Sequence, residues 1–167
     1  MNAILRRRSI RKYTNEPISE EQIHQLLEAA MSAPSARNQR RWDVLVITEP
    51  GKLEQAGEVS PYARMAKTAP LAILVCGDLR REPQQDGFWA QDCAAAAENL
   101  LIEAVELGLG AVWLGIYPIQ ERVAYLQGVF GLPEHVAPFA LIPVGYPAET
   151  RPAPSRYDAA RVHRNAW

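Results

Sequence analysis

The stretch Leu71-Ala72-Ile73-Leu74-Val75-Cys76-Gly77 decides the fold class of this chain. It carries no polar side chain, whereas a strand with one solvated face would alternate apolar and polar residues. The run is also too short for a typical helix and ends at a glycine. It therefore predicts a short strand that is covered on both of its faces.

Further strands and helices are expected on both sides of this run. Apolar stretches bounded by Gly or Pro predict strands at 42–48, 111–116 and 139–144. Helices are expected from Ser19 to Pro34, at 52–67 with an interruption at Pro61, at 88–107 and at 119–127. Because helices and strands interleave without an internal repeat, the class is α/β or α+β with a sheet of four or five strands.

The composition fits a single globular domain. The chain has 167 residues, of which 48% are hydrophobic and 22% charged, and its net charge is -1. Nothing in this balance favours nucleic acid or an anionic membrane, and the longest apolar segment, 93–109, is interrupted by acidic residues. No signal peptide is visible. Cys76 and Cys93 lack a CxxC pattern and indicate reduced core residues of a cytoplasmic protein, and the three histidines form no metal site.

The densest chemical signal is the segment RRRSIRKY at 6–13. Its five cations surround the hydroxyl of Ser9, and they repel one another unless an anion lies among them. A guanidinium fork matches a phosphate face, and a hydroxyl completes the cage. The alternative is a solvated basic terminus that binds nothing.

Three other stretches carry weaker signals. The loop APSARNQRRW at 33–42 offers the hydrogen-bonding groups of Ser35 and Asn38, although these are also ordinary turn residues. In GLGAVWLGIYP at 108–118, Gly115 would let the backbone approach a flat ligand, or would simply end a strand. Arg156, which follows GYPAE at 145–149, matters only if it joins the N-terminal cations at one anion.

Together these stretches resemble the FMN-dependent nitroreductase family, in the same order and along essentially the whole chain. RRSIRKY is similar to the family's phosphate signature, and APSARNQRRW to its Pro-Ser-x-x-Asn-x-Gln-Pro-Trp loop. GLGAVWLGIYP resembles the segment that lies against the flavin ring, and GYPAE with RVHRNAW resembles the C-terminal region. The resemblance implies one α+β domain over 1–167, with a central mixed sheet of four to five strands flanked by helices, in a homodimer with two flavins at its interface.

The resemblance also implies which residues bind FMN. Those at the phosphate, ribityl chain and pyrimidine edge are Arg7, Arg8, Ser9 and Arg11, with Arg156 also at the phosphate. Those that reach the flavin from the other subunit are Pro34, Ser35, Ala36 and Asn38. Those that place backbone amides near the flavin N5 are Leu114 and Gly115. We expect Arg11 to act on the redox chemistry, because a cation at the flavin edge favours the reduced anion, and Arg6 and Lys12 to be solvated.

Two features depart from the family pattern. Arg40-Arg41 replaces the family's Gln-Pro, so Arg40 either reaches the flavin edge or adds positive charge for an anionic substrate. The segment 78–88 is short, which leaves the substrate pocket open or roofed by the partner. The tail at 147–167 carries the apolar anchors Tyr157, Val162 and Trp167 and is expected to embrace the partner subunit.

The implied activity is an NAD(P)H-driven two-electron reduction of nitroaromatics, quinones or similar small electron-poor acceptors by a ping-pong mechanism. FMN is the cofactor, and NADH or NADPH is the electron donor. The protein supplies position and electrostatics, so no acid–base side chain is required. Two alternatives stay open: a specialised flavin enzyme on the same scaffold, such as a dehalogenase or dehydrogenase, and a non-catalytic flavin-binding protein.

Overall fold

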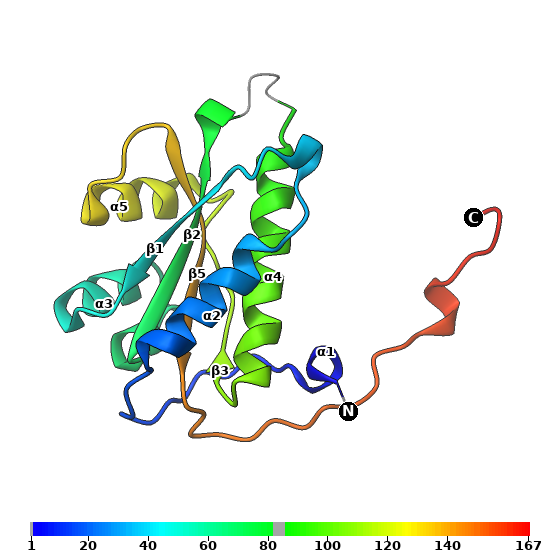
Figure 1. Cartoon of the computed structure of the whole chain (residues 1–167), viewed down its shortest axis with the longest axis horizontal. Coiled ribbons are helices and arrows are strands. Elements are labelled where there is room, and N and C mark those ends of the chain that lie inside the picture. The colour runs from blue at the N-terminus through cyan, green and yellow to red at the C-terminus, as the bar shows by residue number, and fades with distance from the viewer. Residues whose placement is uncertain (1, 82–85) are drawn as a thin grey trace.

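The structure is a computed structural model that describes residues 2–81 and 86–167 (Figure 1). The strands are β1 (Trp42–Ile47), β2 (Leu71–Asp78), β3 (Gly110–Ala111), β4 (Leu114–Gly115) and β5 (Val136–Gly145). The α-helices are α1 (Ala3–Arg6), α2 (Glu20–Met31), α3 (Pro50–Gly57), α4 (Phe88–Glu106) and α5 (Gln120–Phe130). Short 3-10 helices are η1 (Ala36–Asn38), η2 (Arg64–Thr68), η3 (Leu79–Arg81) and η4 (Ala159–Arg161).

The strands form one five-stranded sheet. Its order is β1-β2-β5-β3, and β4 also pairs with β5. The ladders between these strands are antiparallel, and Leu74 of β2 lies opposite Leu45 of β1 and Leu141 of β5. A parallel element is present as an isolated bridge between Ser9 and Ala111. The predicted α+β fold with a sheet of four or five strands is confirmed.

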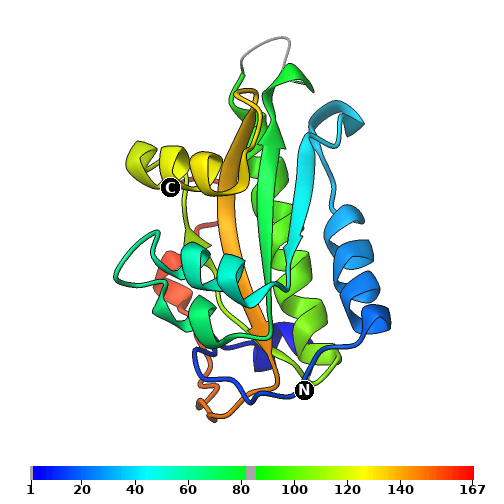
Figure 2. The same ribbon diagram turned by 90° about the vertical axis from the view of Figure 1, so that its left-hand side faces the viewer.

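Helices cover both faces of the sheet, which explains the uninterrupted apolar run. Leu71, Ile73 and Val75 belong to the core that includes residues of α2 and α4. The alternating Ala72, Leu74 and Cys76 belong to the core that includes residues of α3 and α5. Figure 2 shows α2 and α4 on one face of the sheet and α3 and α5 on the other. All eight residues of β2 are therefore buried, as predicted for its apolar part.

The helix predicted from Ser19 is confirmed as α2. Ser19 accepts a hydrogen bond from the Gln22 amide at 3.2 Å, and the Gln22 side chain accepts one from the Ser19 amide at 3.1 Å. This reciprocal capping satisfies two backbone donors at the start of the helix. The helix ends at Met31, so Pro34 lies in the following loop.

The strand predicted at 111–116 is interrupted in the structure. It consists of β3 and β4, which both pair with β5 and are separated by Val112 and Trp113. Val112 packs into the core of α3 and α5, while the ring of Trp113 lies 5.6 Å from that of Phe139 on the other side. In the register that β3 and β4 share, Pro143 of β5 lies opposite Val112. Proline has no amide hydrogen to donate, so the ladder lacks a hydrogen bond at this point.

The structure adds detail at the N-terminus and in the segment 78–88. The short helix α1 was not predicted; its N-cap Asn2 accepts a hydrogen bond from the Leu5 amide at 3.1 Å. In the segment 78–88, η3 follows β2 directly, and 82–85 lie outside the described residues. In the part of the chain that is described, no helix is both long and apolar enough to cross a membrane.

We predict that Gly77→Ala destabilises the protein by about 1–3 kcal/mol, because overpacking a filled core forces side chains and backbone apart. A Cβ at Gly77 would overlap the ring of Trp89 and lie 2.9 Å from its Cζ3. Gly51→Ala in α3 is the matched control, since nothing lies within 4 Å of its Cβ. It should be neutral or stabilise by up to about 1 kcal/mol. Urea denaturation measures both, and equal midpoints would contradict the packing of Trp89 on β2.

Candidate functional site

The basic N-terminal segment is fixed by its backbone at one end of the sheet. The Ile10 amide donates to the Ala111 carbonyl of β3 at 3.0 Å, and the Thr14 amide donates to the Tyr146 carbonyl at 2.9 Å. The Ala148 amide donates in turn to the Lys12 carbonyl at 2.8 Å. Residues 9–14 therefore run between β3 and the start of the C-terminal tail, so the N-terminal segment lies beside the beginning of the tail (Figure 1).

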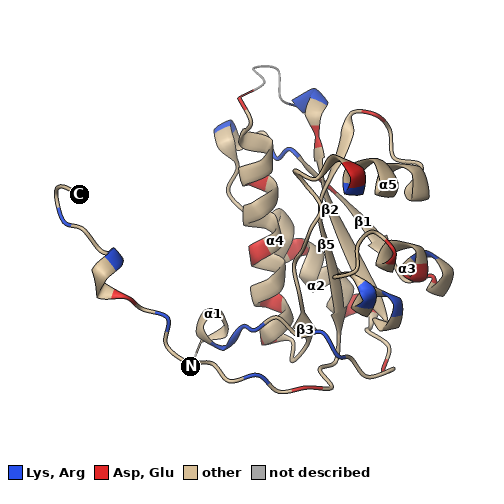
Figure 3. Cartoon of the chain, turned by 180° about the vertical axis from the view of Figure 1, so that it is seen from behind, with Lys and Arg blue, Asp and Glu red and all other residues tan. Residues whose placement is uncertain are grey.

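The segment and the tail line an open cavity of about 350 Å³ on the surface. Its lining consists of four arginines, one serine and one proline: Arg8, Ser9, Arg11, Arg151, Pro152 and Arg156. The structure thus brings Arg156 to the N-terminal cations. From the sequence, this proximity was required for Arg156 to take part in binding an anion. Figure 3 shows Lys and Arg along both the N-terminal segment and the neighbouring tail. Guanidinium groups and a hydroxyl around one space suit a phosphate.

Hydrogen bonds across this cavity hold its two walls together. Arg8 Nε donates to the Pro152 carbonyl at 2.7 Å, and the Arg11 amide donates to Glu149 Oε1 at 2.7 Å. Arg151 donates to Glu149 Oε2 from Nε and from a terminal nitrogen, at 3.1 and 2.8 Å. The bonds from the Arg11 amide and from Arg151 lower the pKa of Glu149, so the carboxylate stays ionised between these donors.

Arg151 is a cavity residue that sequence reasoning missed. It stands two residues after Glu149, in a tail whose prolines gave no periodic signal. Its position depends on the Glu149 carboxylate, which also receives the Arg11 amide. The sequence does not reveal that Arg151 pairs with Glu149 within the tail. Which side of the tail faces the N-terminal segment is decided by the path of its backbone in the folded protein.

Arg7 and Arg6 point toward helix α4 instead of the cavity. Arg7 Nε lies 3.4 Å from Glu98, and Arg6 pairs with Glu106 at 3.2 Å. Arg7 also lines a neighbouring space with Arg8, Arg156 and Tyr157. Arg6 is exposed to solvent, as expected, and its guanidinium also forms a surface ion pair with Glu106. A phosphate-anchoring role of Arg7 stays a prediction.

The strand β4 leaves open space at Gly115. No described residue comes within 4 Å of a Cβ built there, and Gly115 is exposed, whereas Leu114 is buried against β5. Arg122 donates to the Gly115 carbonyl at 2.7 Å and fixes the backbone at this point. A flat ligand therefore has room to approach the backbone of Gly115, although its amide contact with such a ligand stays a prediction.

The loop that carries Pro34, Ser35, Ala36 and Asn38 lies far from the arginine cavity of the same chain. The Ala36 amide donates to Asp92 Oδ1 at 2.8 Å, near the beginning of α4, whereas Arg6 meets Glu106 at the end of that helix. The two carboxylates, Asp92 and Glu106, are 14 positions apart, which corresponds to about 21 Å along the helix. One chain does not bring these two groups of predicted site residues together, as Figure 1 also shows.

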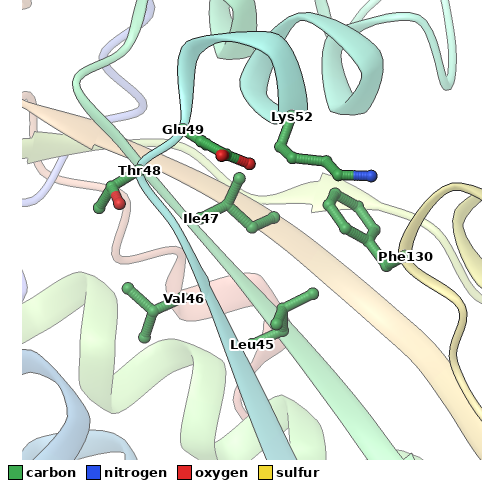
Figure 4. Close-up of a pocket in the computed structure, with 7 residues that line it drawn as sticks. All are labelled: Leu45, Val46, Ile47, Thr48, Glu49, Lys52 and Phe130. Carbon is green, nitrogen blue, oxygen red and sulfur yellow. The ribbon is translucent and has the colours of Figure 1, made fainter.

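Another hollow lies beside the free edge of β1 (Figure 4). Its lining is Leu45, Val46, Ile47, Thr48, Glu49, Lys52 and Phe130. The Lys52 ammonium donates to the Val129 carbonyl at 3.0 Å and lies 5.8 Å from the centre of the Phe130 ring. This groove contains none of the residues that the sequence motifs single out, and its cation is already engaged.

Comparison with known proteins decides the family. The sequence model of the Nitroreductase family matches residues 4–64 and 49–146. The chain belongs to the nitroreductase family.

Relatives of this nitroreductase-family chain agree along its full length. A protein of Methanothermobacter thermautotrophicus, described as a candidate NADH dehydrogenase/NAD(P)H nitroreductase, is 47% identical over 167 residues, which cover 100% of this chain and 87% of that protein. The crystal structure of a candidate NADH oxidase from Clostridium acetobutylicum is 44% identical and has a TM-score of 0.95, with 99% of this chain and 100% of that chain covered. An FMN-dependent nitroreductase from Clostridium difficile is 27% identical, with a TM-score of 0.92 and 99% of both chains covered.

Proposed function

We propose that this chain is an NAD(P)H-dependent FMN oxidoreductase that reduces nitroaromatics, quinones or similar electron-poor small molecules. The observation that carries the proposal is the convergence of Arg8, Ser9, Arg11 and Arg156 on one cavity at the end of the sheet. Membership of the nitroreductase family supports it, as does the name of the FMN-dependent relative from Clostridium difficile.

The residues around this cavity fit the phosphate of FMN. Two predicted arginines, Arg8 and Arg156, offer planar donors to phosphate oxygens, and the Ser9 hydroxyl offers one more. Arg11 is the cation proposed for the flavin edge, where positive charge favours the reduced anionic flavin. FMN, when bound, supplies the hydride chemistry: NADH or NADPH reduces it, and the acceptor reoxidises it. The chain's own groups bind and orient and need not transfer a proton.

The separation of the two groups of site residues supports a homodimer. The loop Ser35–Asn38 lies beside the beginning of α4, and the arginine cavity lies beyond its other end. A two-fold axis that crosses α4 would reverse the helix in the second chain, because both subunits of such a dimer use the same surface. The loop of one subunit would then lie beside the arginines of its partner and complete the flavin site.

The C-terminal tail is proposed to embrace that partner. Residues 150–167 are exposed throughout and extend away from the helices and the sheet (Figure 1). Tyr157, Val162 and Trp167 are 77%, 51% and 101% exposed, which is unfavourable for three large apolar side chains in water. A second subunit that covers them would remove this cost.

The first prediction concerns the flavin itself. The purified protein should be yellow, and its visible absorbance should bleach when NADH or NADPH is added without oxygen and recover on addition of a quinone or nitroaromatic. A colourless protein that takes up no added FMN would contradict the proposal. Bound FMN that no pyridine nucleotide reduces would indicate a flavin-binding protein, and reduction without turnover of either acceptor class would indicate a specialised enzyme.

The second prediction concerns the phosphate. Arg156→Ala should weaken FMN binding by about 10- to 150-fold, because a hydrogen bond between charged groups contributes about 1.5–3 kcal/mol. Riboflavin, which lacks the phosphate, should bind both proteins with similar affinity. Arg161→Ala is the matched control, since Arg161 lies in the same tail, pairs with Asp158 at 3.2 Å and does not line the cavity. Fluorescence titration measures these affinities, and an equal loss for riboflavin would rule out a phosphate contact.

The third prediction separates the tail from the site. A chain that ends after Arg156 keeps every residue of the cavity and the hydrogen bonds of Ala148 and Glu149 to the N-terminal segment. It loses Tyr157, Val162 and Trp167, so its dimer should dissociate more readily in sedimentation equilibrium. The combined variant Tyr157→Ser and Trp167→Ser in the full chain is the second measure. Dimers as stable as the wild type in both proteins would contradict the embrace.

A further inference from the structure

Arg41 has an environment that is unusual for an arginine. It occupies the position where the family pattern has a proline. Although arginine side chains usually reach solvent, that of Arg41 is 0% exposed. Its Nε donates to the Arg81 carbonyl at 2.9 Å, and one terminal nitrogen lies 3.4 Å from Asp92 Oδ2. Asp92 is itself only 4% exposed. A buried charge pair of this kind needs a reason, because removing two charges from water is costly.

The second terminal nitrogen of Arg41 points toward another carboxylate. It lies 3.7 Å from Asp86 Oδ2 and has no hydrogen-bond partner among the described residues. Asp86 in turn accepts a hydrogen bond from Arg37. Arg41 therefore faces two carboxylates at once, one on α4 and one just before it.

Both carboxylates also hold the loop that contains Ser35–Asn38. Asp92 uses Oδ2 toward Arg41 and Oδ1 to accept the Ala36 amide at 2.8 Å. Asp86 binds the side chain of Arg37, the next residue of the same loop. The cation of Arg41 thus lies beside the two carboxylates to which Ala36 and Arg37 are attached, although Arg41 itself follows the segment Ser35–Asn38.

The loop needs such support because its backbone is strained. Arg37, Asn38 and Arg40 have φ values of 53°, 54° and 46°, in the left-handed region that favours glycine. Each residue of this kind costs about 1–3 kcal/mol and persists only where its surroundings enforce it. Within the loop, the Arg40 amide donates to the Ser35 hydroxyl at 2.9 Å, so the strain and the position of Ser35 are coupled.

We propose that Arg41 is a positioning residue for the flavin site: it holds Asp92 and Asp86, which keep the loop Ser35–Asn38 in the shape that the partner subunit's flavin requires. This inference rests on the proposed FMN function. It assigns a role to a residue that departs from the family pattern and that does not itself touch the flavin.

The test compares three variants of the full-length protein at a temperature where each is folded. Arg41→Met removes the cation while keeping most of the stem, and Arg41→Lys keeps a charge near Asp92 but loses the planar donors. Leu53→Ala is the matched control, because Leu53 is 4% exposed in the core on the opposite face of the sheet. It lowers the thermal midpoint without touching the loop.

We expect Arg41→Met to weaken FMN binding at least about tenfold, as a misplaced supporting shell commonly does, and Arg41→Lys to recover part of that loss. Leu53→Ala should keep the wild-type affinity for FMN although its thermal midpoint falls. An Arg41→Met protein that binds FMN as the wild type does would overturn the proposal. If Arg41→Met does not fold, wild-type FMN affinity in Arg41→Lys would overturn it as well.

A flavin-independent measurement separates this inference from the proposed function. Hydrogen exchange at the Ala36 amide should be slow in the wild type and at least about tenfold faster in Arg41→Met, since loss of Arg41 releases Asp92. Unchanged exchange at Ala36 would overturn the role of Arg41 whatever the flavin result. If the wild type binds no FMN but Arg41→Met still exchanges faster at Ala36, the proposed function is contradicted and the role of Arg41 in holding the loop is supported.

Discussion

Arginines at 6–8 and 11 repel one another, so an independent constraint must hold several of them in a small volume. That constraint is the backbone of 9–14, which hydrogen-bonds to β3 on one side and to the start of the tail on the other. Amide hydrogen bonds of this kind do not depend on charge, and they fix where each side chain leaves the segment. Glu149 then pairs with the charge of Arg151 and also accepts a hydrogen bond from the Arg11 amide. The arginine cavity is therefore a product of strand-like pairing, and the cations only line it.

Helix α4 connects this cavity to the rest of the proposed site. Its early residue Asp92 supports the loop Ser35–Asn38, and its later residues Glu98 and Glu106 pair with Arg7 and Arg6. The helix packs in the core through small residues, among them Ala96 and Ala97, which let it lie close to the sheet. A rigid helix between the two groups keeps them apart within one chain, and for that reason the proposed flavin site draws on a second chain.

Much of the fold was predictable because local signals agreed with the final packing. The capping box at Ser19 and the apolar run of β2 each specify an element without knowledge of the rest, and both were confirmed. The cysteines were correctly expected in the core, where burial raises the pKa of Cys76 to about 12. The interruption between β3 and β4 was not predictable, because Val112 and Trp113 fit a strand equally well. The interruption depends on which residue of β5 lies opposite Val112, and that residue is Pro143, which has no amide hydrogen to donate.

The site shows the same division between local and long-range information. The cluster at 6–13 could be recognised from its positive charge, whereas its proximity to Arg156 is established only by the fold. Arg41 shows the limit most clearly: in sequence it is one of two adjacent arginines in a polar loop, and Arg40 was the one expected to matter. In the structure Arg40 is exposed, whereas Arg41 is sealed against Asp92. Positive charge in a sequence indicates a candidate ligand site. The sequence does not show that one of these cations, Arg41, is instead buried against the carboxylate that binds the Ala36 amide.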